Sequence, residues 1–71
     1  MNKELFEQKI KENGIKKVFL AEKCGMTPQS FMAKVNGEQP PFTIEQVETL
    51  KMYLRLTFDE VQQIFFKDWV D

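Results

Sequence analysis

The chain has 71 residues, of which 42% are hydrophobic, and it carries a net charge of −1. This length allows one domain with a small core, so residues 1–71 are expected to form a single unit. The apolar runs are far shorter than the roughly 20 residues of a membrane-spanning helix, and no secretion signal opens the chain. Cys24 is the single cysteine, so no internal disulfide can form. We therefore expect a cytoplasmic protein with no membrane partner.

The charge is distributed unevenly along the chain. Residues 1–37 contain seven lysines and four glutamates, a net charge of +3, whereas residues 38–71 have a net charge of −4. Such asymmetry indicates a charged partner, and the positive half also contains the motif described below.

Capping residues and apolar spacing predict a first helix over about residues 3–13. Asn2 is a suitable N-cap and Gly14 a suitable C-terminal stop. Phe6 and Ile10 lie four residues apart and start an apolar stripe on this helix.

Two short helices that meet at a tight corner are expected within residues 17–36. The first spans about 17–23 and the second about 28–35. Gly25 lies where the chain must turn, a position that often needs positive φ, and Thr27 is a good N-cap. Two helices joined by a short turn that contains glycine are typical of a helix-turn-helix.

The helix at 28–35 is expected to be apolar on one side and mostly polar on the other, because successive residues lie about 100° apart. Four apolar residues share the inward side: Pro28, Phe31, Met32 and Val35. Four residues, none of them acidic, share the outward side: Gln29, Ser30, Ala33 and Lys34. A short face without acids suits the major groove of DNA.

The second half of the chain predicts two further helices. Pro40 and Pro41 interrupt helical structure, and Thr43 then opens a capping box and a helix over about 44–55. The apolar residues of that helix are Ile44, Val47, Leu50, Tyr53 and Leu54. A fifth helix starts after Thr57, with these apolar residues: Phe58, Val61, Ile64, Phe65, Phe66, Trp69 and Val70. No strand pattern is present, so the expected fold class is all-α.

Five helices with this corner resemble the phage repressor and Cro family, also called lambda-repressor-like or XRE-type domains. The residues that carry the resemblance are Leu20-Ala21, Gly25-Met26, Thr27 through Ser30, Asn36-Gly37 and Phe42-Thr43. Within the family, the chain is similar to small switch regulators of phages of Gram-positive bacteria. The resemblance implies a compact five-helix domain that binds DNA through its third helix.

The predicted DNA contacts are eight residues: Lys16, Lys17, Thr27, Gln29, Ser30, Ala33, Lys34 and Asn36. The resemblance implies that Lys17 and Asn36 touch phosphates. It also implies that the groove-facing residues are Thr27, Gln29, Ser30 and Ala33. Gln29 can form two hydrogen bonds with adenine. At Ala33 the family often has arginine or glutamine, whereas alanine offers a methyl contact to thymine. For the polar members of this set, a solvated surface position is the competing interpretation.

A second departure from the family concerns Ile10 and Val35. The family often has an arginine at the first position and an acid at the second. Apolar replacement of such a pair can be neutral or stabilising.

The aromatic C-terminal region predicts a protein interface formed by Phe65, Phe66, Trp69 and Val70. One short helix cannot bury this much apolar surface in so small a core, and exposed aromatic clusters often mark interfaces. The alternative is that Phe65 packs in the core while the others cover the surface. The expected associations are a homodimer or a complex with another protein.

Two functions are consistent with these features. The first is a transcriptional regulator of a lysis–lysogeny-like switch that binds double-stranded operator DNA through its third helix. The alternative is an antirepressor, or modulator of repression, that binds a partner repressor protein and alters its DNA binding. Catalysis is not expected, because the chain has no histidine, metal-ligand cluster or phosphate-binding glycine loop. No cofactor, metal or small-molecule substrate is therefore predicted.

Overall fold

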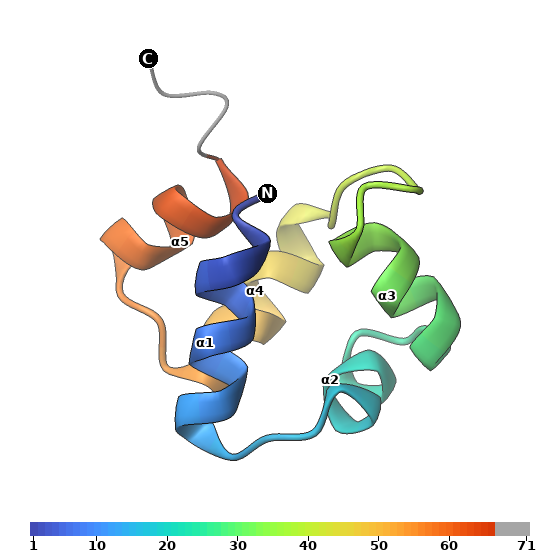
Figure 1. The fold of residues 1–71 in the computed structure, drawn as a ribbon, viewed down its shortest axis with the longest axis horizontal. Helices are drawn as coiled ribbons and strands as arrows, with labels where there is room; N and C mark the ends of the chain where they lie inside the picture. Colours follow the sequence, from blue (N-terminus) through green and yellow to red (C-terminus); the bar gives the residue numbers. More distant parts are fainter. Residues whose placement is uncertain (67–71) are drawn as a thin grey trace.

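The computed structural model describes residues 1–66, which form five α-helices and no strand (Figure 1). The helices are α1 (Lys3–Asn13), α2 (Lys17–Lys23), α3 (Pro28–Val35), α4 (Ile44–Leu54) and α5 (Phe58–Phe65). The all-α prediction is confirmed for this part of the chain. None of the five helices is long and apolar enough to cross a membrane.

Side-chain caps explain where four of the helices begin. The N-cap side chains that accept a hydrogen bond from a first-turn N–H are those of Asn2, Thr27, Thr43 and Thr57. In α4 and α5 the third helical residue, Gln46 or Glu60, accepts a bond from the N–H of the cap in return. These reciprocal bonds satisfy donors that have no partner inside the helix.

The C-terminal ends of α1, α2 and α3 agree with the prediction, whereas those of α4 and α5 differ. Gly14 ends α1 in the left-handed conformation with φ of 64°, as predicted. Arg55 adopts the same conformation with φ of 53°, so α4 ends one residue earlier than expected. Helix α5 ends at Phe65, so the prediction that Phe66 belongs to it is wrong. The predicted residues Trp69 and Val70 lie outside the described residues.

One hydrophobic core connects all five helices. The buried residues are Phe6, Ile10, Leu20, Ala21, Phe31, Val35, Val47, Leu50, Leu54, Leu56, Val61 and Ile64. No polar or charged residue is buried within residues 1–66. Ile10 and Val35, where the family often pairs an arginine with an acid, are both members of this apolar core.

Four phenylalanine rings form the centre of this packing. Phe6 of α1 contacts Phe31 of α3, Phe42 and Phe65 of α5, with ring centroids 5.9 to 6.3 Å apart. Phe42 also contacts Phe31 at 5.5 Å and Phe65 at 6.1 Å. The cluster therefore joins α1, α3 and α5 through the connection that precedes α4. The N-terminus lies against α5 (Figure 1), because the Asn2 N–H donates to the Ile64 carbonyl at 2.7 Å.

Three residues assigned to apolar helix faces are exposed. Pro28 is exposed, Ile44 is 68% exposed and Phe58 is 67% exposed. Each is the first residue of its helix. The inward stripe of each helix begins only after this first position, so helical periodicity overestimates burial there.

Candidate nucleic-acid interface

Helices α2 and α3 are separate and meet at a corner formed by residues 24–27 (Figure 1). The Gly25 N–H donates to the Glu22 carbonyl and the Met26 N–H to the Ala21 carbonyl, both at 3.0 Å. Gly25 has φ of 73°. Glycine adopts this left-handed conformation at little energetic cost because it has no Cβ atom. Thr27 then caps α3 through the Ser30 N–H. The predicted limits of both helices, 17–23 and 28–35, are confirmed.

The two sides of α3 differ as the sequence predicts. Phe31 and Val35 are buried in the core at 0% and 4% exposure. On the other side Gln29 is exposed, and the remaining outward residues, Ser30, Ala33 and Lys34, are half-buried. The helix contains no acidic residue. Its outer face therefore offers an amide, a hydroxyl and a methyl group to a partner.

At the start of α2, Lys17 is already engaged with an acid. Its Nζ lies 2.8 Å from Glu7 Oε2 of α1, and both side chains are about one-third exposed. Lys16 precedes α2 as its exposed N-cap residue and makes no side-chain capping bond. An anion that binds here must compete with Glu7 for Lys17, whereas Lys16 forms no ion pair with an acid of residues 1–66.

At the end of α3, the predicted contacts Lys34 and Asn36 both have a hydrogen-bond partner, and neither partner is an acid. Lys34 Nζ donates to the Pro40 carbonyl at 2.9 Å. Lys3 Nζ of α1 donates to Asn36 Oδ1 at 2.6 Å. Lys3 is not among the DNA contacts predicted from the sequence. No local signal could have revealed it, because Lys3 and Asn36 are separated by 33 positions.

The Thr27 hydroxyl caps α3 as a hydrogen-bond acceptor and still has a hydrogen to donate. Its Oγ1 accepts the capping bond from the Ser30 N–H at 3.1 Å. A hydroxyl has a proton to donate besides its acceptor lone pairs. Thr27 is exposed, so that proton can be donated to a phosphate oxygen.

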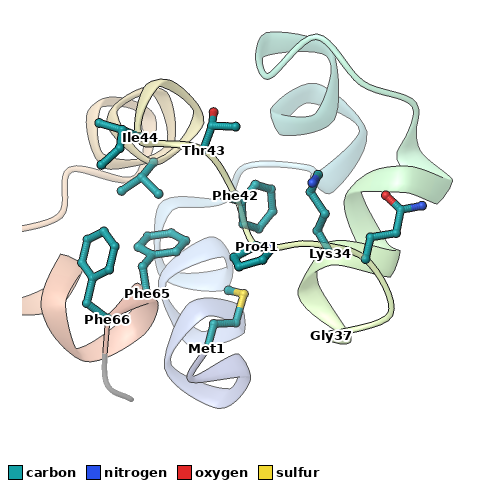
Figure 2. A pocket seen from close by; sticks show the side chains of 11 residues that line it. Met1, Lys34, Gly37, Pro41, Phe42, Thr43, Ile44, Phe65 and Phe66 are labelled. Atoms are coloured by element: carbon teal, nitrogen blue, oxygen red, sulfur yellow. The ribbon is translucent and has the colours of Figure 1, made fainter. Parts of the chain in front are cut away.

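A groove of about 450 Å³ lies beside the end of α3 (Figure 2). Its lining residues are Met1, Lys34, Gly37, Gln39, Pro41, Phe42, Thr43, Ile44, Val47, Phe65 and Phe66. Figure 2 shows Phe65 and Phe66 on one side, Lys34 and Gly37 on the other, and Phe42 between them.

The predicted interface residues Phe65 and Phe66 both line this groove and are both half-buried. Phe65 also belongs to the aromatic cluster, so it is part of the packing as well as of the surface. Ile44 is the most exposed large hydrophobic residue of the groove lining. Ile44 is not among the predicted interface residues, because its spacing within α4 predicts a core residue.

The shifted pKa values within residues 1–66 lie away from the outer face of α3. A hydrogen bond between Lys9 of α1 and Glu60 of α5 raises the pKa of Lys9 and lowers the pKa of Glu60. The pKa of Glu12 is lowered by a hydrogen bond from Gln8 and by the charge of Lys9. Burial raises the pKa of the half-buried Cys24 thiol. In the same residues no three His, Cys, Asp or Glu side chains are placed to hold a metal ion.

Comparison of the chain with family models, with curated proteins and with solved structures finds no match in any of the three. The resemblance to the repressor and Cro family is therefore a prediction that rests on the five-helix pattern and on the motif residues from Leu20 to Thr43 quoted above.

Proposed function

We propose that this protein is a small helix-turn-helix regulator of a phage-type genetic switch. It binds double-stranded operator DNA through the outer face of α3, in the cytoplasm of a bacterial host, and it acts as a binding protein rather than an enzyme. The observation that carries the proposal is that α3 is amphipathic. Phe31 and Val35 anchor it in the core, while Gln29 is exposed on a face without acids.

The outer face of α3 supports recognition of an A·T-containing half-site. The exposed Gln29 amide can donate to and accept from the major-groove edge of one adenine. Ala33, half-buried on the same side, can contact a thymine methyl group. Gln29 and Ala33 are four residues apart and therefore neighbours on the helix surface. The adenine and the thymine are accordingly expected at adjacent or nearly adjacent base pairs.

Phosphate contacts would fix the position of α3 on the duplex. Lys16 and Lys17 at the start of α2, and Asn36 beyond α3, are candidates for these sequence-independent contacts. The net charge of residues 1–37 is only +3, so we expect a homodimer in which two domains contribute contacts. Its two half-sites would lie about 34 Å apart, one turn of DNA.

Selection from a pool of random DNA duplexes tests the proposal directly. The protein is expected to enrich a two-fold symmetric site with an adenine contact in each half. Its affinity should fall linearly on a log–log plot against salt, with a slope of about −0.9 per phosphate contact. Absence of enrichment, together with no binding at about 100 mM salt, would refute the hypothesis.

The groove beside α3 favours a second candidate function, binding of a partner repressor as an antirepressor. Groove residue Ile44 is 68% exposed, and exposed apolar surface on a small domain often marks an interface. Residues 38–66 carry five acids and two bases. An acidic region of this kind complements the basic surface that a DNA-binding repressor must have.

This second hypothesis is tested by mixing the protein with a repressor of the proposed switch. Light scattering should detect a complex, and operator DNA should compete with its formation. Ile44→Ser should weaken the complex, whereas Met52→Ser should not, because Met52 lies on the same helix with 65% exposure but outside the groove. Equal behaviour of both variants would exclude the groove as the contact surface.

A further inference from the structure

We infer that Lys3 of α1 is a phosphate-contacting residue of the DNA interface and forms one shared site with Asn36. This inference rests on the proposed function and adds a helix outside the α2–α3 pair to the binding surface. Its basis is the contact between the start of α1 and the end of α3, where Lys3 Nζ donates to Asn36 Oδ1 at 2.6 Å.

The geometry leaves donors available on both side chains. An ammonium group has three hydrogens, and the bond to Asn36 uses one of them. Because the Asn36 oxygen accepts from Lys3, its NH₂ group has two hydrogens to donate elsewhere. Both residues are exposed. A phosphate oxygen beside them can therefore accept from the ammonium group and from the amide together.

The charges around this site are not neutralised within residues 1–66. The ion pairs in this part of the chain involve only Lys9 and Lys17, so neither Lys3 nor Lys34 contacts an acid. Lys34, two residues before Asn36, donates to the neutral carbonyl of Pro40. Glu38 is the acid of the following loop, and it is exposed and pairs with neither lysine.

The end of α3 itself supplies too little negative charge to balance these lysines. A helix C-terminus corresponds to roughly half an elementary charge, whereas Lys3 and Lys34 carry one full positive charge each. A phosphate group can therefore bind here without displacing a carboxylate. This distinguishes the site from Lys17, which already has Glu7 as its counterion.

A contact from α1 also has a mechanical consequence. Phosphate contacts from Lys17 on α2 and from Lys3 on α1 would hold the domain at two points outside α3. Such contacts determine the orientation of a recognition helix without adding sequence preference. Lys3 is accordingly a positioning residue whose loss weakens binding to every sequence equally.

The test compares Lys3→Gln, Lys3→Arg and Lys51→Gln by fluorescence anisotropy with a selected operator and with an unrelated duplex. One phosphate contact with counterion release alone is worth roughly eightfold in affinity at 0.1 M salt and roughly fourfold at 0.2 M. Lys3→Gln should show these losses on both duplexes, with a salt slope smaller by about 0.9. Lys3→Arg should retain the affinity, and Lys51→Gln, on exposed α4 surface, should match the wild type.

Three results would overturn the inference. If the wild type binds DNA but Lys3→Gln keeps its salt slope, Lys3 only supports the end of α3. If the losses from Lys3→Gln and Asn36→Ala add fully in the double variant, the two residues do not share one site. If the wild type binds no duplex at all, the proposed function fails first and the phosphate contact fails with it.

Discussion

The outer face of α3 and the groove beside it differ in the chemical character of the side chains that they present. Around α3, Lys17 pairs with Glu7 and Lys3 with Asn36, while the Gln29 amide is exposed. The groove instead contains apolar side chains, and its rim residue Ile44 is 68% exposed. A polar group can exchange its protein partner for a phosphate or base contact. Exposed apolar surface contributes favourable free energy only when a partner covers it.

The two regions nevertheless depend on one support. Phe31 holds the inner side of α3, and its ring lies 5.5 Å from that of Phe42, which lines the groove. Through Phe6 both rings are joined to α1. A substitution in this cluster should damage both surfaces, whereas a substitution of Gln29 or of Ile44 should damage only the surface to which that residue belongs.

The largest expected effect comes from Phe31→Ala. Truncation of a fully buried phenylalanine costs about 3–5 kcal/mol, a large part of the roughly 4–11 kcal/mol expected for a domain of this size. Urea unfolding should show this loss, and DNA binding should weaken with it. Phe58→Ala removes the same atoms from a ring that is 67% exposed, and its cost should stay within about 0.5 kcal/mol. Similar losses in both variants would contradict the central role of Phe31.

Gln29→Ala should separate the α3 face from the groove. Loss of a two-bond contact to adenine costs about 1–3 kcal/mol at one base position, while stability should hardly change because Gln29 is exposed. Binding to operators substituted one base pair at a time measures this effect. Gln63→Ala, at an exposed position of α5, is the matched control. A uniform loss over all operators would mean that Gln29 does not specify sequence.

Glu7→Gln should strengthen DNA binding, because it frees Lys17 from its acid. A partly exposed ion pair of this kind is worth about 0.2–1 kcal/mol, which corresponds to roughly 1.4- to fivefold in affinity. The salt slope should become steeper, since Lys17 then displaces a counterion from phosphate. Glu48→Gln on α4 removes an equal charge that pairs with no lysine in the described part of the chain. If both variants bind alike, competition at Lys17 is refuted.

The smallest expected effect concerns the stability of the folded protein at acid pH, to which the contact between α1 and α5 contributes. This contact takes no part in either proposed binding surface. The hydrogen bond from Lys9 lowers the pKa of Glu60 below its ordinary value of 4.5. Glu60 therefore adds stability above about pH 4.5, and this contribution is lost as the pH falls through its lower native pKa. Glu60→Gln should flatten that part of the stability curve, as measured by urea unfolding between pH 7 and about 3.

Glu60→Gln should leave the α5 cap intact, because Gln46 performs the same capping task in α4. Lys9→Met removes the other partner and should flatten the curve in the same range. An unchanged acid limb in both variants would show that the pair adds no pH-dependent stability.

The amino-acid sequence by itself determined the all-α class and most helix limits. It did so because caps and glycine stops act over three or four residues. Thr27 and Gly25 define the corner before α3 through bonds to residues at most five positions away. The amphipathic character of α3 also follows from the spacing of apolar residues in the sequence, since Phe31 and Val35 are four residues apart and both buried.

Only the tertiary structure decided which distant groups meet. Lys3 contacts Asn36 and Lys17 contacts Glu7 across separations of 33 and 10 residues, and no local pattern encodes these partners. The groove likewise arises where α3, α4, α5 and the N-terminus come together. Exposure of Ile44 depends on that packing, because a residue at the first position of a helix is buried only if another element covers it.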